Sequence, residues 1–184
     1  MALKATVFKV ELQVSDLDRN YYQTHSLTLA RHPSETDERM MIRVLAFALN
    51  ASEPLQFTKG LSTEAEPDLW QKNLHGEIGL WIEVGVPDAK RIRKGSNRAE
   101  QIIIYAYGAR TAPVWWQSIQ DDLARFDNLT IGYLSPENTA ALAGLANRNM
   151  TLQATLQDGL IWIGNSEQTL TITPEYWQRA RLSD

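Results

Sequence analysis

Hydrophobic and polar residues alternate at the start of this chain of 184 residues. Every second residue of the first segment is hydrophobic, at Phe8, Val10, Leu12 and Val14. This period is typical of a β-strand with one buried face. The polar stretch 15–20 predicts a turn, and the Thr- and Tyr-rich stretch 21–30 predicts a returning strand. The N-terminal segment therefore predicts an antiparallel hairpin.

A helical period follows this hairpin. Pro33 and Ser34 precede a stretch from about Glu35 to Leu49 in which apolar residues recur every three or four positions. Ser34 is expected to cap the first amides of the helix, and Asp37 adds a carboxylate in its first turn. Glu38 falls on the same side as the apolar stripe, so its carboxylate is expected to tilt toward the core.

The middle of the chain alternates between strand and helix patterns. Strands are expected at 55–58, 78–84, 101–107 and 129–134, and helices at 88–99, 113–126 and 135–145. A strand, a helix and a second strand in this order usually form a right-handed parallel unit. The tail 151–173 predicts short strands joined by hairpin turns. We therefore expect an α/β fold, with a mixed central sheet and β-rich additions at both ends.

Composition narrows the class of protein. With 43% hydrophobic residues the chain can bury one substantial core, and we expect a single domain over residues 1–184. There is no cysteine, which excludes disulfides, thiolate zinc sites and cysteine nucleophiles. No signal-like segment is seen, and no apolar run approaches the roughly 18 residues that a membrane span needs. We expect a cytoplasmic protein without a membrane partner.

Charge argues against extensive nonspecific binding to nucleic acid. The formal net charge is -4 and the pI is about 5.4, which does not fit a histone-like coat of phosphate contacts. One local basic strip could still bind phosphates, at Lys90, Arg91, Arg93, Lys94 and Arg98. Such a strip is more often a solvated helix face than a binding site.

Two carboxylates lie where a hard cation could be bound. Asp68 follows Pro67 in an acidic turn, and Glu83 lies between Ile82 and Val84 in the strand 78–84. A charged side chain in a strand covered on both faces is costly unless it is paired or metal-bound. The plainer alternatives are a turn cap for Asp68 and a helix-terminus charge for Glu38. If the carboxylates of Glu38, Asp68 and Glu83 approach each other, their repulsion must be relieved by a proton or a cation, and Mg²⁺ is the natural cation.

Longer strings of residues show a resemblance that covers essentially the whole chain. They are His32–Met41, Phe57–Ser62, Glu66–Trp70, Leu80–Gly85, Lys90–Lys94 and Ile104–Tyr107. In these strings the chain resembles the YaeQ family, a small bacterial family of the PD-(D/E)XK nuclease-like superfamily. The resemblance implies a core of helix, strands, helix and strand.

The resemblance also implies roles for the acidic residues. Glu38, Asp68 and Glu83 match the acidic residue of the first helix, the Asp after the first strand and the Glu of the E-x-K motif. Gly85 stands where the lysine of that motif would be, so another cation must take its place. Lys94 ranks first as this catalytic residue, and the further candidates for phosphate or nucleic-acid contact are Lys59, Lys90, Arg91, Arg98 and Gln101.

Two classes of function follow from these residues. The first is a Mg²⁺-dependent nuclease in which Glu38, Asp68 and Glu83 bind the metal and a displaced Lys or Arg contacts the phosphate. The second is a catalytically weakened relative that binds nucleic acid or a protein partner in the same cleft, for instance in transcription-related control. The position of one cation separates the two classes.

Overall fold

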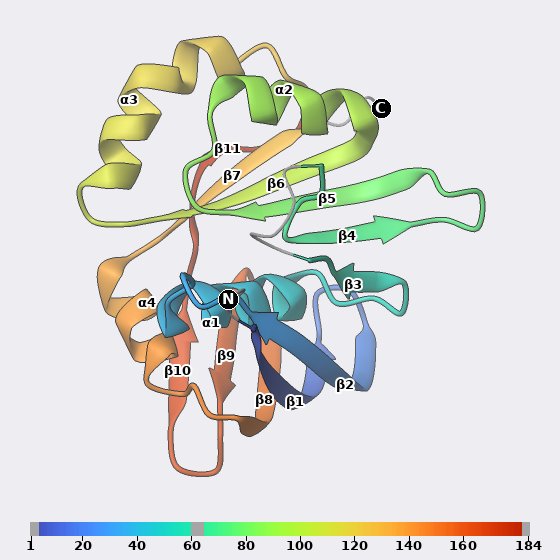
Figure 1. Cartoon of the computed structure of the whole chain (residues 1–184), viewed down its shortest axis with the longest axis vertical. Helices are drawn as coiled ribbons and strands as arrows, with labels where there is room; N and C mark the ends of the chain where they lie inside the picture. Colours follow the sequence, from blue (N-terminus) through green and yellow to red (C-terminus); the bar gives the residue numbers. More distant parts are fainter. Residues whose placement is uncertain (1–3, 60–64, 182–184) are drawn as a thin grey trace. The chain divides into compact units, whose positions relative to one another are not determined.

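The structure, a computed structural model, describes residues 4–59 and 65–181 (Figure 1). Residues 60–62 of the string Phe57–Ser62 and Glu64 of the acidic turn lie outside this description. The chain divides into two compact units, each built from two segments: Met1–Ala51 with Glu137–Thr173, and Ser52–Pro136 with Pro174–Asp184. The α/β class is confirmed. The single domain over 1–184 stays a prediction, and each unit is described here by itself.

The first unit contains a five-stranded sheet in the order β10-β9-β8-β1-β2. Its strands are β1 Thr6–Asp16, β2 Tyr21–Arg31, β8 Asn149–Gln157, β9 Leu160–Gly164 and β10 Thr169–Ile172. β1 and β2 form the predicted antiparallel hairpin, and β8, β9 and β10 form the predicted hairpins of the tail. β8 pairs with β1 in parallel, so the two β-rich ends of the chain make one sheet.

Helix α1, Asp37–Leu49, packs on the inner face of this sheet. The predicted alternation of β1 is confirmed, since Val10, Leu12 and Val14 are each at most 1% exposed. His25 of β2 meets Phe47 of α1 edge to face, with ring centroids 5.0 Å apart. The unit also contains α4, Pro136–Ala143, where a helix over 135–145 was expected.

The predicted start of the first helix is wrong by two residues. The helix begins at Asp37 rather than Glu35, and its N-cap is Thr36, whose side chain accepts a hydrogen bond from the Arg39 amide at 3.1 Å. Ser34 lies two residues before this cap and hydrogen-bonds His32 instead. Both are good capping residues, and the sequence pattern alone does not choose between them.

The second unit contains a six-stranded sheet in the order β11-β7-β6-β5-β4-β3. Its strands are β3 Leu55–Phe57, β4 Leu69–Lys72, β5 Ile78–Val84, β6 Ala99–Tyr107, β7 Leu129–Leu134 and β11 Glu175–Gln178. β5, β6 and β7 are mutually parallel neighbours, as the strand and helix order predicts. β4 and β11 were not predicted, because four residues are too few to establish a period.

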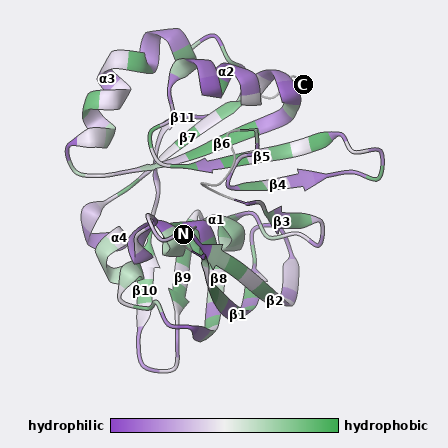
Figure 2. Ribbon diagram, viewed as in Figure 1, coloured by the Kyte–Doolittle hydropathy of each residue, from purple (hydrophilic) through white to green (hydrophobic). Residues whose placement is uncertain are grey.

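Two helices connect these parallel strands and pack against β6: α2, Ala89–Arg98, and α3, Thr111–Leu123. Both lie over the same face of the sheet (Figure 1). α2 is mostly hydrophilic (Figure 2) and comes very close to the sheet at Gly95, where an added Cβ would be 2.7 Å from Ile102 and 2.9 Å from Trp81. In the described part of the chain, no helix is long and apolar enough to cross a membrane.

Candidate functional site

The second unit brings Asp68 and Glu83 together across a pair of antiparallel strands. Leu69 of β4 is opposite Ile82 of β5, so Asp68, one residue earlier, stands beside Glu83, one residue later. The Asp68 amide donates to the Ile82 carbonyl at 3.0 Å. One carboxylate oxygen of Asp68 accepts the Val84 amide at 2.8 Å. These two bonds hold Asp68, which directly precedes β4, beside the carboxyl end of β5.

Both carboxylates are buried, Asp68 at 5% exposed and Glu83 at 2%. Glu83 Oε1 accepts from Arg91 Nε at 2.5 Å. Glu83 Oε2 is buried and has no hydrogen-bond partner among the described residues. Burial raises the pKa of Glu83 to about 7; Arg91 opposes this shift, and the charge of Asp68 adds to it. Glu83 therefore takes up a proton or a cation close to neutral pH.

Arg91 ties α2 to this site at two points, the Glu83 carboxylate and the Glu66 carbonyl. The side chain of Asp88, the N-cap of α2, accepts the Arg91 amide at 2.8 Å. Besides pairing with Glu83, the guanidinium donates from Nη2 to the Glu66 carbonyl at 2.8 Å. Arg98, about two helical turns further along α2, donates to the Ala65 carbonyl at 3.1 Å. The basic helix thus anchors the acidic turn that precedes Asp68.

A second polar group lies near Glu83 on the same strand face. Trp81 is two residues earlier on β5, is 0% exposed, and its indole N–H also has no partner among the described residues. Successive same-face residues of a strand are neighbours, so a buried acceptor and a buried donor lie close together. The indole N–H acts on Glu83 as a hydrogen-bond donor that lowers its pKa, so the two groups partly satisfy each other.

The other cations proposed from the sequence are placed differently. Lys90 and Lys94 are exposed on α2, and Gln101 is exposed at the start of β6. Lys59 is exposed, and its amide reaches the Glu66 carboxylate at 3.4 Å. Arg91, which ranked below Lys94, is the one that contacts Glu83. The available signal was its spacing of four residues from the buried Gly95, which places both on the sheet side of α2.

Glu38 belongs to the first unit, in the first turn of α1, and is half-buried. Each unit is defined separately, so its convergence with Asp68 and Glu83 stays a prediction. The more deeply buried carboxylate nearby is Glu35, which the sequence analysis did not single out. It is 6% exposed and pairs with Arg43 at 2.5 Å and Arg39 at 2.6 Å. This network holds the segment before α1 and leaves Glu38 outside it.

Within residues 4–59 and 65–181 no group of three or more His, Asp or Glu side chains could hold a metal ion together. The second unit by itself supplies two carboxylates, Asp68 and Glu83. Mg²⁺ needs only one or two carboxylates because it keeps several water ligands and also binds substrate phosphates. A pair of this kind therefore remains chemically sufficient for Mg²⁺, although not for a fully protein-enclosed site.

The sequence model of the YaeQ protein family matches residues 1–174. The chain belongs to the YaeQ family. A YaeQ relative from Salmonella typhi, named an uncharacterized protein, is 50% identical over 179 residues, which is 97% of this chain and 99% of the relative. A YaeQ protein of Escherichia coli strain K12, also named uncharacterized, is 48% identical over 179 residues, which again is 97% of this chain and 99% of the relative.

Two solved YaeQ structures are also similar. The crystal structure of the YaeQ protein from Xanthomonas axonopodis pv. citri matches with a TM-score of 0.91 at 44% identity, covering 95% of this chain and 98% of that one. The YaeQ protein from Pseudomonas syringae matches with a TM-score of 0.92 at 34% identity, covering 96% and 98%. The resemblance seen in the sequence strings to the YaeQ family is thus confirmed.

Proposed function

We propose that this YaeQ-family chain is a divalent-cation-dependent phosphodiesterase that acts on nucleic acid, with a variant PD-(D/E)XK site. Asp68 and Glu83 are the ligands of the ion, and Arg91 takes the place of the missing lysine. The observation that supports this most is the Glu83 carboxylate, which is buried beside Asp68 with one oxygen lacking a hydrogen bond among the described residues. Such a group is costly in a structural role and useful as a ligand.

The residues present fit Mg²⁺ as the bound ion. Both donors are carboxylates, which are the oxygen ligands that hard cations prefer. The pKa of Glu83 is raised mainly by its burial, and the charge of Asp68 adds to the shift, as expected for two carboxylates held together out of water. When bound, Mg²⁺ would polarise the phosphoryl oxygen and lower the pKa of a bound water. The indole N–H of Trp81 is suitably placed to hold an oxygen atom beside Glu83.

Arg91 contributes charge and position. Its guanidinium has five N–H donors in a plane, which suits two-point binding of a phosphate as well as of a carboxylate. Without substrate it neutralises Glu83; with substrate, the same group lies close enough to offset the charge on the phosphodiester. Its bond to the Glu66 carbonyl holds the guanidinium beside Glu83.

The second candidate function is binding without cleavage, to nucleic acid or to a protein. It is favoured by Gly85, whose φ of 118° lies in a region that residues other than glycine rarely adopt. A lysine in the usual E-x-K place would therefore strain the backbone here. An arginine cannot readily give up a proton, so Arg91 can stabilise charge but cannot act as the general base.

Binding of the ion is tested by thermal unfolding in EDTA and in Mg²⁺ or Mn²⁺. We expect the metal to raise the unfolding temperature of the wild type by mass action, and Asp68→Asn and Glu83→Gln to abolish that rise. Glu100→Gln, an exposed carboxylate on β6, is the matched control and should respond like the wild type. Equal metal-induced shifts in all four proteins would contradict the metal site.

Cleavage is tested on single-stranded, duplex and structured nucleic acids with Mg²⁺ or Mn²⁺. We expect Arg91→Ala to lower the rate by about a hundredfold or more while the metal-induced stabilisation persists. Lys94→Ala removes the same charge from an exposed position of α2 and should have little effect. A large loss in Lys94→Ala alone would restore Lys94 as the catalytic cation. If the wild type binds nucleic acid in a salt-sensitive way without cutting it, the second candidate function is correct.

A further inference from the structure

The outer edge of β2 is long, regular and exposed. β2 runs over 11 residues, Tyr21–Arg31, and pairs with β1 along that whole length without a register shift. It is the last strand of its sheet, and no other strand among the described residues pairs with its outer edge. A strand edge of this length offers a row of backbone donors and acceptors to another strand.

The neighbouring hydrogen bonds show which residues of β2 face this edge. The Lys9 amide donates to the Arg148 carbonyl at 2.9 Å, and the Val7 carbonyl accepts from the Arg148 side chain at 3.0 Å. Odd-numbered residues of β1 thus direct their backbone toward β8. The β2 residues opposite them are even-numbered and point away from β1. Accordingly, the Ala30 carbonyl accepts from Arg43, not from β1.

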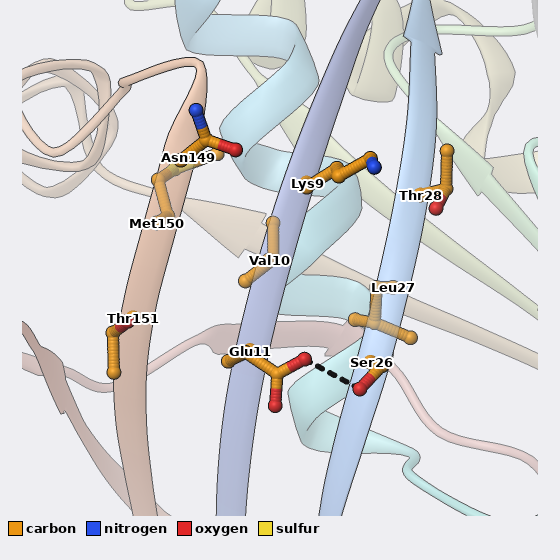
Figure 3. Close-up of a pocket in the computed structure, with 9 residues that line it drawn as sticks. All are labelled: Lys9, Val10, Glu11, Ser26, Leu27, Thr28, Asn149, Met150 and Thr151. Carbon is orange, nitrogen blue, oxygen red and sulfur yellow. Dashed lines mark hydrogen bonds between the residues drawn. The ribbon is translucent and has the colours of Figure 1, made fainter.

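The residues with outward backbone groups are Tyr22, Thr24, Ser26, Thr28 and Ala30, all of them exposed. The Ala30 carbonyl is already bonded to Arg43, so the part of the edge that a second strand can pair with in full is Tyr22–Thr28. The features that usually protect an edge are missing from Tyr21–Arg31. There is no proline, no lysine and no carboxylate, and Arg31 at the very end is the single Arg, Lys, Asp or Glu. Ser26 and Thr28 lie on the outer face beside Glu11 and Lys9 of β1 (Figure 3).

The side chains along this edge are complementary to themselves. If two copies meet antiparallel about a two-fold axis at Ser26, Thr24 lies opposite Thr28 of the second copy, and Tyr22 lies opposite Ala30. Cross-strand pairs of Ser and Thr are favourable, and even-numbered residues meet even-numbered ones, as their hydrogen bonds require. Arg31 meets Tyr21 of the second copy, a ring that already lies 5.4 Å from the Arg19 guanidinium. Arg31 would also approach Arg19 of the second copy, and the ion pair of Arg31 with Asp37 of its own chain offsets that repulsion.

We propose that β2 is a self-association edge, at which a second copy of this chain adds its own β2 in antiparallel register centred on Ser26. Two five-stranded sheets would then form one continuous sheet, with the same residues contributed by each copy. Because the contact consists mainly of one strand from each copy, the dimer is expected to be weak and reversible.

Sedimentation of the wild type over a range of micromolar concentrations measures the association. We expect a monomer–dimer equilibrium. Two double variants at the same positions then test the register. In T24K/T28E each introduced lysine faces an introduced glutamate of the second copy, so the dimer should become several-fold tighter; in T24K/T28K lysines face lysines, and it should become weaker. Thr28 lies opposite Lys9 of the same chain, so T28E should stabilise the monomer slightly and T28K should destabilise it slightly. Unfolding measured at a concentration where all three proteins are monomeric separates this effect from the change in association.

A label test uses the absence of cysteine from the chain. Ser26→Cys carrying a pyrene should give excimer emission that rises with concentration, because the two labels lie on adjacent strands. Thr151→Cys, on the same sheet face but on β8, is the matched control and should show monomer emission only. A wild type that stays monomeric at every concentration, equal shifts in the two double variants, or excimer emission from the control and not from Ser26→Cys would each overturn the proposal.

Discussion

At the scale of single residues, the burial of Glu83 could be anticipated and its partner could not. Glu83 lies between hydrophobic residues of a strand covered on both faces, so the apolar run of β5 was enough to predict a buried carboxylate. Arg91 was harder to predict because five basic residues lie within nine positions. Which of them reaches the sheet depends on how closely α2 approaches, and that distance is set by Gly95.

The burial of Glu83 predicts a pH dependence of stability. Its pKa is raised from 4.5 to about 7, so the folded state holds a proton that the unfolded state has released. This contribution is complete below about pH 4.5 and is lost as the pH rises to about 7. Glu83→Gln keeps the neutral form at all pH values. In EDTA, the free energy of unfolding of the variant, relative to that of the wild type, should increase by about 3 kcal/mol between pH 4.5 and pH 8.

Urea unfolding at several pH values measures this difference. Glu100→Gln, which removes an exposed carboxylate, should follow the wild type over the same range. If the difference in free energy of unfolding between Glu83→Gln and the wild type does not change with pH, the pKa of Glu83 in the folded protein is that of an ordinary carboxyl group. The proposal that Glu83 is a metal ligand would then lose the support of its raised pKa.

At the scale of elements, the long segments were predictable and the short ones were not. β1, β2, β5 and β6 have enough residues for an alternation or an apolar run to appear, and each lies where the pattern indicates. β4 and β11 depend on pairing with strands distant in sequence. The predicted start of α1 was wrong for another reason. Two potential caps are two residues apart, and the hydrogen bond of Ser34 to His32 decides between them.

The two caps can be distinguished by mutation. Thr36→Ala should destabilise the protein by about 1 kcal/mol, because the Arg39 amide loses its acceptor at the N-terminus of α1. Ser34→Ala should cost less, since it removes an exposed side chain–side chain bond to His32 and leaves the helix capped. Chemical denaturation of the two variants in the same buffer compares them directly. A larger loss in Ser34→Ala would mean that the helix starts where the sequence pattern first placed it.

At the scale of the whole molecule, the chain order hides how the units are built. Each unit combines two segments that are separated in the sequence, and β1 pairs in parallel with β8, about 140 residues away. Local periodicity predicts strands and helices but not which distant strands pair. For the same reason the sequence predicted Asp68 in a turn before the strand of Glu83, but not the pairing of β4 with β5 that brings the two side by side. The helical period predicted that Glu38 tilts toward the core, and its role beside the other two came from the family resemblance.

The participation of Glu38 gives a prediction about the whole chain. If its carboxylate joins Asp68 and Glu83 in one site, Glu38→Gln should reduce the Mg²⁺-induced rise in unfolding temperature, less than Asp68→Asn does, because one or two carboxylates suffice for Mg²⁺. Glu137→Gln is the matched control, since it removes a carboxylate from the first turn of α4 in the same unit. An unchanged metal response in Glu38→Gln, with its loss in Asp68→Asn, would show that the second unit binds the ion alone.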